Sequence, residues 1–434
     1  MTSPLFPYVT GKQISIEYEE AREMSLRRRI QFPSGRRFES RMFAELNASG
    51  DTWDRWWKSF LNGSSSRFLG GRTRPLRVVD LFSSVGGLSL GVREAAKALG
   101  FGFATQMAVD LDDDALATYS VNFSPNKTVN ASVRSLIDYR VSASRGDAWF
   151  EEEPTAIRDA SDLTGIDLII GGPPCQGHSS LNNHTRGDDV RNDLYLTLPA
   201  MAVALEAKAL IVENVPRVVH DAREVVDSSI HLLERAGYAV VSGTLSADAL
   251  GWPQTRSRHF LIASRTGVLR SPDQVADEVG RPAASIFWAI DGLEDDLPGD
   301  EVMRSTPRMS DENIDRVKWL FENEKYDLEN HMRPACHRDG HTYPSVYGRL
   351  YPDRPAPTIT TGFQTPGRGR FVHPTRQRVL TAREAARIQG FPDSFEFSCA
   401  TGDVTRSMLQ KWIGDAVPSI LGFTAGLIAL ESLV

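Results

Sequence analysis

The chain has 434 residues, 41% of them hydrophobic and 24% charged, which is ordinary for a globular protein. No apolar run approaches the ~20 residues that a membrane-spanning helix needs, and Met1–Tyr8 lacks the basic start and apolar core of a signal peptide. The three cysteines are too few for a disulfide scaffold and lack metal-ligand spacing. We therefore expect a metal-free protein of the reducing cytoplasm.

Charge is distributed unevenly along the chain. The net charge of −7 argues weakly against a nucleic-acid partner, but residues 331–378 hold 8 Arg against 2 Asp. The preceding residues 266–330 hold 7 Lys or Arg against 16 Asp or Glu. A local basic region can follow DNA phosphates even on an acidic protein. It is equally typical of a solvated surface, and charge alone leaves both interpretations open.

Residues 1–75 form an N-terminal extension of unknown role. The mixed charges of Glu17–Arg29 predict a helix, and a second helix is predicted over Thr52–Leu61. Trp53, Trp56 and Trp57 lie on this second helix, where we expect them to pack against the main body of the protein rather than form a separate ligand site.

From residue 76 to residue 267, short apolar runs alternate with amphipathic segments. This alternation predicts a doubly wound, Rossmann-like α/β domain with a mostly parallel sheet, whose ligands bind at the carboxyl ends of the strands. The predicted strands are Leu76–Phe82, Phe103–Asp110, Asp167–Gly171, Ala209–Glu213, Tyr238–Leu245 and His259–Ser264, with helices over Leu88–Leu99, Asp113–Asn122 and Leu194–Ala207.

Two motifs at strand ends predict a site for a polar ligand. The first strand runs into a turn containing Gly86 and Gly87, and backbone N–H groups at the following helix start can hold such a ligand closely. The turn lacks the Gly-x-Gly-x-x-Gly pattern of dinucleotide-binding proteins, which disfavours a dehydrogenase. The second strand ends at Asp110, whose carboxylate can accept hydrogen bonds from ribose hydroxyls.

A reactive thiol is predicted at Cys175. It follows an apolar strand and the sequence Gly171-Gly-Pro-Pro, whose prolines stiffen the chain and present the side chain at the mouth of the sheet. The thiolate is the nucleophilic form of cysteine, and a nearby cation or helix start favours it. The alternative is a rigid turn with a structural cysteine.

Two further strands supply a carboxylate and a pair of arginines. Glu213 ends a buried strand, where an unpaired charge is costly unless it is used. In the sequence Gln254-Thr-Arg-Ser-Arg258, strand alternation places Gln254, Arg256 and Arg258 on one face, where they can steady a carboxylate and bind a carbonyl oxygen. A surface ion pair is the alternative for the two arginines.

The order of these motifs resembles that of the cytosine-5 DNA methyltransferase family. Three later segments resemble further blocks of that family, namely Tyr347–Thr361, Arg378–Phe395 and Gly414–Pro418. The resemblance covers residues 76–434. It implies a catalytic domain over residues 76–267, a loop-rich target-recognition lobe over 268–376 and a C-terminal segment, 377–434, that returns to the catalytic domain.

The resemblance also implies a role for individual residues. Cys175 would attack the cytosine ring, Glu213 would hold the ring nitrogen and amine, Arg258 the ring carbonyl, and Arg256 would support the loop. S-adenosylmethionine, with S-adenosylhomocysteine as product, would contact Asp80, Phe82, Ser84, Gly86, Gly87, Asp110, Leu111, Pro174, Asp415 and Val417. Ser84 and Asp415 stand where the family often has Gly and Asn. The residue that touches the adenine amino group stays open between Ser132 and Asp162.

Double-stranded DNA is the expected partner, bound by a monomer. The residues expected to contact it are Gln176, Ser179, Gln254, Arg349, Thr360, Arg368 and Arg370. Relatives that methylate tRNA carry a Cys-Phe-Thr sequence, whereas Cys336 is followed here by His337 and Arg338, which disfavours that substrate. A non-catalytic DNA-binding regulator is the other alternative. Three biological roles remain open: restriction-modification, defence, or action as an orphan methylase. The first two imply a cognate restriction or defence protein as partner.

Overall fold

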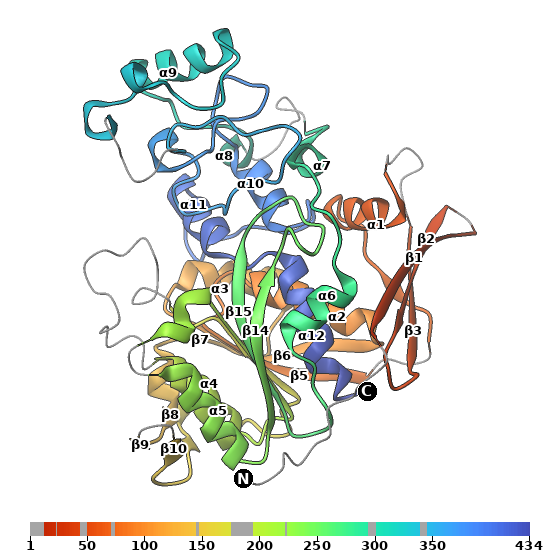
Figure 1. The fold of residues 1–434 in the computed structure, drawn as a ribbon. Coiled ribbons are helices and arrows are strands. Elements are labelled where there is room, and N and C mark those ends of the chain that lie inside the picture. The colour runs from red at the N-terminus through yellow and green to blue at the C-terminus, as the bar shows by residue number, and fades with distance from the viewer. Residues whose placement is uncertain are drawn as a thin grey trace.

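A seven-stranded sheet organises the computed structural model, in the order β14-β15-β13-β12-β5-β6-β7 (Figure 1). The five strands from β13 to β7 are parallel, and β15 is antiparallel to its neighbours β13 and β14. The predicted Rossmann-like architecture is therefore confirmed. The structure describes residues 13–22, 24–43, 50–70, 74–144, 147–174, 194–221, 224–293, 301–338 and 345–434.

The sheet strands and their helices match the predicted segments closely. Apolar runs without polar alternation favour central strands buried on both faces, and this is how these strands are packed. The strands are β5 (Arg74–Leu81), β6 (Phe101–Asp110), β7 (Thr128–Asn130), β12 (Leu168–Gly171), β13 (Ala209–Asn214), β14 (Ala239–Ser246) and β15 (Ser257–Ser264). The helices between them are α2 (Gly87–Ala98), α3 (Asp113–Phe123), α4 (Thr197–Ala204) and α5 (Val225–Arg235).

Two hydrophobic cores lie on the two faces of the sheet. One core joins α2, α3 and the C-terminal helix α12 (Ser419–Glu431) to the sheet, and the other joins α4 and α5 to the opposite face. Gly91 of α2 and Gly422 of α12 allow the two helices to touch, because a Cβ at Gly91 would stand 2.3 Å from the Ser419 carbonyl oxygen and 2.7 Å from the Gly422 Cα. The C-terminal segment thus completes the core beneath the turn between β5 and α2.

The chain reverses direction across the sheet next to β5. It continues from β5 to β6 and β7 on one side, and then returns to place β12 and β13 on the other. The gap that this reversal leaves at the carboxyl ends of β5 and β12 is where α/β proteins bind ligands. The strand order therefore locates the candidate site before any side chain is considered.

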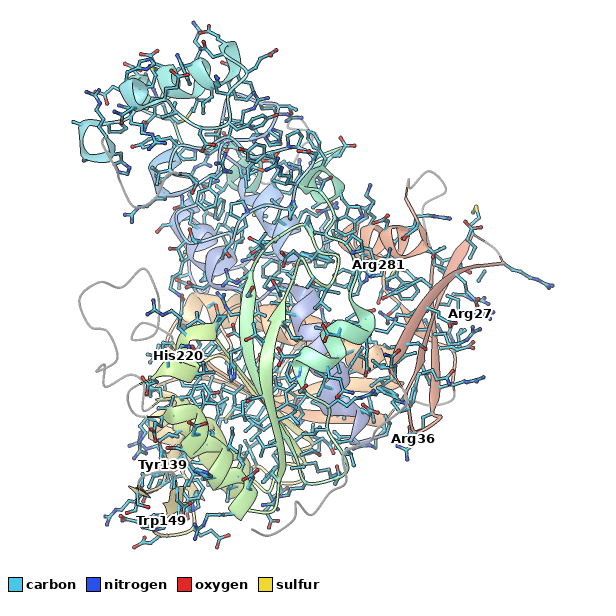
Figure 2. All side chains as sticks on the ribbon, viewed as in Figure 1. Arg27, Arg36, Tyr139, Trp149, His220 and Arg281 are labelled. Carbon is cyan, nitrogen blue, oxygen red and sulfur yellow. The ribbon has the colours of Figure 1, made fainter. Side chains whose placement is uncertain are left out.

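The N-terminal extension forms a second, four-stranded antiparallel sheet of β1 (Ser15–Ala21), β2 (Ser25–Gln31), β3 (Arg37–Phe43) and β4 (Arg67–Phe68). The helix predicted over Glu17–Arg29 is wrong, because this segment is a hairpin of β1 and β2. Leu26, Arg28 and Ile30 alternate as buried residues, and the charge of Arg28 concealed that two-residue period. Figure 2 shows Arg27 and Arg36 on the outside of this sheet.

The predicted packing of the tryptophans on α1 (Thr52–Leu61) is confirmed. Trp56 and Trp57 are fully buried, and Trp57 meets the rings of Trp252 and Phe423 at centroid distances of 5.6 and 5.3 Å. Arg281, labelled in Figure 2, lies over the Trp53 ring and pairs with Asp51. The extension is thus fixed to the catalytic domain by aromatic packing.

The segment 268–376 falls into two parts. Its first helix, α6 (Pro272–Val279), contacts β14 and α12, and its second helix, α7 (Ile286–Ile290), contacts α10 (Ala382–Gln389) and α1. The remainder forms a separate lobe (the small lobe) with α8 (Glu301–Arg304) and α9 (Asp311–Glu322), above α10 and α11 (Arg406–Asp415) in Figure 1.

Short hairpin strands project from the opposite end of the catalytic domain, and Figure 2 shows Trp149 there. They are β8 (Ile137–Asp138), β9 (Val141–Ser144), β10 (Asp147–Phe150) and β11 (Thr155–Ala156). Within the described ranges, a single helix long and apolar enough to cross a membrane is absent; α11 and α12 together pass that test only as a bent pair.

Candidate active site

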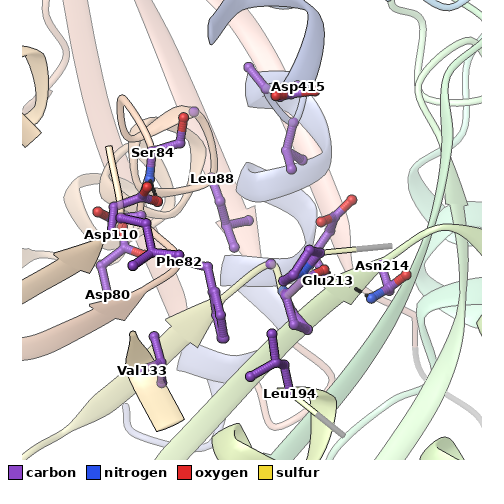
Figure 3. A pocket seen from close by; sticks show the side chains of 18 of the residues that line it. Asp80, Phe82, Ser84, Leu88, Asp110, Val133, Leu194, Glu213, Asn214 and Asp415 are labelled. Atoms are coloured by element: carbon purple, nitrogen blue, oxygen red, sulfur yellow. Dashed lines mark hydrogen bonds between the residues drawn. The ribbon is translucent and has the colours of Figure 1, made fainter. Parts of the chain in front are cut away.

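A cavity of about 490 Å³ opens at the carboxyl ends of β5, β6, β12 and β13 (Figure 3). Most of the residues predicted for cofactor and base line it together, although they come from segments more than 300 residues apart. Those residues are Asp80, Phe82, Ser84, Gly87, Asp110, Leu111, Pro174, Glu213, Arg256, Arg258, Asp415 and Val417. Gly86 lies directly behind this lining, at the start of α2.

The turn after β5 is held in an unusual backbone conformation. Phe82 and Ser84 have φ angles of 59° and 46°, and Gly86 has 90°. Side chains rarely adopt this left-handed region, and such strain persists only where the surroundings enforce it, as at ligand sites. Asp110 enforces it here, because its carboxylate accepts hydrogen bonds from the backbone N–H of Ser84 at 2.8 Å and of Asp112 at 2.9 Å.

The residues that follow β7 form another wall of the cavity. Ala131, Ser132 and Val133 line the cavity, whereas Asp162, the other residue considered for the adenine contact, is not among its lining residues. Leu111 lies on the rim with 75% of its surface exposed. A large apolar side chain open to solvent at a cavity edge is suited to pack on an aromatic ring.

At the other end of the cavity, Glu213 and Arg258 form an ion pair. The distance between Arg258 Nε and Glu213 Oε1 is 2.8 Å, and Glu213 is 8% exposed. Burial raises the pKa of the Glu213 carboxyl, although Arg258 and Arg256 oppose this effect. A carboxyl whose pKa is raised by burial can hold a proton near neutral pH and donate it to a bound molecule.

The chain between β12 and the prolines passes very close to Glu213. A Cβ on Gly172 would stand 2.8 Å from Glu213 Oε2, so only glycine leaves room for that carboxylate. Asn214 fastens the same loop by donating from Nδ2 to the Pro173 carbonyl oxygen at 3.2 Å. The motif Glu213-Asn-Val contained Asn214, but no local pattern pointed to its partner Pro173.

Arg256 supports the site rather than pointing freely into it. Its guanidinium is 3% exposed and donates to the carbonyl oxygens of Ile359, Gly414 and Asp415 at 2.9, 3.1 and 3.2 Å. These bonds join β15 to the C-terminal segment. The strand predicted to carry Gln254, Arg256 and Arg258 begins only at Ser257, so Arg256 lies in the approach to it.

Asp80 lies at the bottom of the cavity, 2% exposed, and belongs to a buried polar chain. Ser89 Oγ donates to its Oδ2 at 2.6 Å and lies 3.0 Å from the Tyr119 hydroxyl. Burial raises the pKa of Asp80 to about 7. Side chains that sequence reasoning did not assign also line the cavity, namely Ser83, Leu88, Leu194, Val215, Lys411 and Ala416.

Substituting Asp80→Asn tests whether this carboxyl is protonated in the native state. Between its ordinary pKa of 3.8 and about 7, Asp80 keeps its proton when folded and loses it when unfolded. The wild-type free energy of unfolding therefore carries a penalty that grows as pH rises through this window, reaching a few kcal/mol. We therefore expect the free energy of unfolding of wild type, relative to that of Asp80→Asn, to fall as the pH rises from 3.8 to about 7. Urea unfolding without cofactor measures both. Parallel pH profiles would contradict the assignment.

Cys175, Gln176 and Ser179 lie outside the described residues. Pro173 and Pro174, which immediately precede Cys175, line the same cavity as Asp110 and Glu213. The described part of the chain contains no group of three or more His, Cys, Asp or Glu side chains that could hold a metal ion.

Three of the side chains predicted to contact DNA make contacts inside the protein, and their contact with DNA stays a prediction. Gln254 is fully buried and its amide bonds to Ile388, Gln389 and Ile359. Arg349 donates to the Pro374 carbonyl oxygen and lies 3.9 Å from the Phe321 ring centroid. Arg370 donates to Tyr326 and Arg349 carbonyl oxygens and pairs with Asp327.

The two remaining candidates differ from these three. Arg368 is exposed on the small lobe and Thr360 is half-buried. Arginine guanidinium groups can stack on aromatic rings and donate to carbonyl oxygens as readily as they bind phosphates. The sequence counted the arginines of residues 331–378 but could not separate those that build the lobe from those that face solvent.

Known proteins resemble this chain over most of its length. The model of the family described as C-5 cytosine-specific DNA methylase matches residues 76–424. The type II methyltransferase M1.BsuMI of Bacillus subtilis is 42% identical over 362 residues, which cover 83% of this chain and 81% of that protein. The type II methylase M.HgiDII of Herpetosiphon aurantiacus is 29% identical over 80% of this chain and 92% of its own.

Solved structures show the same fold. A prophage-encoded DNA modification methyltransferase of E. coli has a TM-score of 0.54 at 26% identity, covering 82% of this chain and 99% of that one. The Dnmt2 methyltransferase of S. pombe has a TM-score of 0.52 at 18% identity over the same shares, which supports the fold alone. The cavity at the strand reversal, the Glu213–Arg258 pair and the family match over residues 76–424 lead to one conclusion: this chain belongs to the C-5 cytosine-specific DNA methylase family and is a DNA cytosine-5 methyltransferase.

Proposed function

We propose that the chain transfers a methyl group from S-adenosylmethionine to carbon 5 of a flipped cytosine in duplex DNA, through a transient covalent bond to Cys175. The observation that carries this proposal is the single cavity that Asp110, Pro174 and the buried Glu213–Arg258 pair line together. One end suits a nucleoside and the other suits a pyrimidine ring. The nucleophile predicted from the sequence follows directly after Pro174.

The residues of the first end fit S-adenosylmethionine. Asp110 retains lone pairs for ribose hydroxyls, Leu111 and Phe82 offer apolar faces to adenine, and Ser132 offers a polar group at the wall that follows β7. A Cβ on Gly87 would stand 3.0 Å from the Ala416 Cβ, so this glycine keeps the turn against the segment of Asp415 and Val417. When bound, the cofactor supplies a methyl group on a sulfonium centre.

The residues of the second end fit the chemistry of a bound cytosine. Attack of the Cys175 thiolate on carbon 6 moves the electron pair of the ring double bond toward carbon 5 and the ring nitrogen. Burial raises the pKa of the Glu213 carboxyl, which favours donation of a proton from it to that nitrogen and so offsets the growing charge, and Arg258 donates to the ring carbonyl. After carbon 5 is methylated, loss of its proton restores the double bond and releases Cys175.

A stacked base cannot reach a cavity of this kind, so the target cytosine leaves the helix at a cost of a few kcal/mol. Exposed Arg368 and half-buried Thr360 on the small lobe, together with Gln176 and Ser179, are the residues that we propose to face the DNA. The protein acts as a monomer in the bacterial cytoplasm. Because two of its relatives are named type II enzymes, we propose a role in restriction-modification.

DNA containing 5-fluorocytosine tests this mechanism. Fluorine at carbon 5 cannot leave as a proton does, so the reaction stops while Cys175 is still bound to carbon 6. We expect wild type with S-adenosylmethionine to give a covalent protein–DNA adduct that survives denaturing electrophoresis, and Cys175→Ser to give none. Absence of an adduct with fluorinated DNA from the organism's own genomic sequences would overturn the proposal.

The substrate class is tested separately with unmodified nucleic acids. We expect labelled methyl transfer to duplex DNA and none to tRNA, because Cys336 is not followed by the Phe-Thr of the tRNA-methylating relatives. Transfer to tRNA alone would reverse the choice of substrate while leaving the covalent mechanism intact. A protein that binds DNA but transfers nothing would instead be the non-catalytic regulator.

A further inference from the structure

We propose that a small pocket on the side of α2, which shares no lining residue with the active-site cavity, binds a tetrahedral oxyanion such as inorganic phosphate. The pocket has a volume of about 70 Å³ and is formed where the turn after α1, the outer face of α2 and the loop after α10 meet. Its polar lining comes from Ser64, Ser65, Arg93, Glu94, Lys97 and Ser394.

The charges around this pocket are not balanced by the protein. Arg93 and Lys97 lie one turn apart on α2, and neither has an ion pair with a carboxylate of the described residues. Glu94, the acidic residue of the lining, is already neutralised by Arg28 at 3.0 Å and accepts a hydrogen bond from Ser66 at 2.9 Å. Three cations thus surround one carboxylate, which leaves an excess of two positive charges.

Both lining cations are partly removed from water. Burial lowers the pKa of Lys97 and of Arg93, which shows that the surroundings disfavour their charges as they stand. Partly buried cations without a counter-charge are costly, and a bound anion would remove that cost. The charge of Glu94 opposes this effect, but Glu94 is also paired with Arg28 and burial still lowers both pKa values.

The geometry of the pocket favours a compact, multiply accepting ligand. Lys97 Nζ donates to Ser65 Oγ at 3.0 Å, and this hydroxyl can turn its own proton toward the pocket. Arg93 is fixed by its bond to the Asn122 carbonyl oxygen at 2.6 Å and by stacking over Phe123, with a guanidinium-to-centroid distance of 4.3 Å. The remaining N–H groups and the Ser64 and Ser394 hydroxyls supply further donors around a space large enough for several waters.

The pocket also joins three parts of the chain. Ser64 and Ser65 belong to the N-terminal extension, Arg93 and Lys97 to the helix that begins at the cofactor turn, and Ser394 to the C-terminal segment. A phosphate held here would therefore tie the extension and the C-terminal segment to α2. This gives the extension a ligand-dependent contact with the catalytic domain.

Thermal unfolding in inorganic phosphate tests the proposal, with sodium chloride adjusted to hold the ionic strength constant. We expect a saturable rise in Tm for wild type, which follows from preferential binding to the folded state. Lys97→Met keeps the side-chain stem but removes the charge, so it should weaken phosphate binding about tenfold or more, as measured by calorimetric titration. Ser65→Ala, a milder change, should weaken it less and guards against misfolding of the first variant.

The control variant is Lys318→Met, which removes an exposed lysine of α9 and should leave the response to phosphate unchanged. Titration of glycerol phosphate alongside inorganic phosphate separates a free anion from the end group of an ester. Saturating S-adenosylhomocysteine should not displace the phosphate. An equal response of wild type and Lys97→Met, no saturable response, or displacement by S-adenosylhomocysteine would each overturn the proposal, and none bears on methyl transfer.

Discussion

Replacing Glu213 by Gln is expected to lower kcat about 100-fold, because a side chain that donates a proton in the transition state typically contributes at least this factor. Gln keeps the shape of the carboxyl group and its place beside Arg258 but cannot release a proton. The KM for S-adenosylmethionine should change little, since Glu213 lies at the opposite end of the cavity from Asp110 (Figure 3). Single-turnover methylation of duplex DNA measures the effect on the chemical step.

The pH profile distinguishes proton donation from a purely structural role of Glu213. Burial raises the pKa of its carboxyl, so the proton that the reaction needs is lost as the pH rises through that pKa, and wild-type kcat should fall on the alkaline side. The Gln variant should lack that alkaline decline. Glu206→Gln, in the exposed turn before the same strand, is the matched control. An alkaline decline retained in Glu213→Gln would assign it to another group.

Replacing Arg256 by Met should lower both stability and activity. The variant leaves three buried carbonyl oxygens, those of Ile359, Gly414 and Asp415, without their donor, and we expect a loss of roughly 3 kcal/mol in the free energy of unfolding. Gly414 and Asp415 lead into the cavity wall at Ala416 and Val417. Displacement of that wall by about 1 Å is enough to lower kcat about 100-fold.

Two measurements separate these effects of Arg256. Chemical unfolding gives the change in stability. The KM for S-adenosylmethionine reports displacement of the cavity wall, and we expect this KM to change more than the KM for DNA. Arg265→Met removes an arginine that follows β15 and stacks on Tyr238. This control should leave the free energy of unfolding and the KM for S-adenosylmethionine near their wild-type values. A variant that is as stable as wild type would show that the three carbonyl oxygens find other donors.

The small lobe shows what the sequence leaves open about single arginines. The arginine-rich composition of residues 331–378 was correct as a count, but Arg349 and Arg370 stack with Phe321 and Tyr351 and bond to backbone carbonyl oxygens. Whether an arginine faces a phosphate or an aromatic ring depends on neighbours distant in the sequence. Composition carries no record of those neighbours.

The helix predicted over the N-terminal hairpin was wrong for a physical reason. Glu17–Arg29 contains charges at spacings that suit a helix, yet Arg29 meets Glu17 and Glu19 across two paired strands. The two-residue period of buried positions included Arg28, which forms an ion pair with Glu94, 66 residues further along the chain. A long-range ion pair of this kind overrides local preference, because burying the arginine alone would be too costly.

The sequence by itself determined the α/β sheet, the order of its strands along the chain and the family, because apolar runs, glycine turns and the Pro-Pro-Cys-Gln and Glu-Asn-Val motifs are local features. It also named Glu213 and Arg258 as members of one site. Only the tertiary structure decided that they form a 2.8 Å ion pair, that Arg256 holds the cavity wall, that Ser132 rather than Asp162 lines the cavity, and that Gln254 is buried. These outcomes depend on the reversal of strand order at β5 and on the return of the C-terminal segment, which bring together atoms that no local pattern connects.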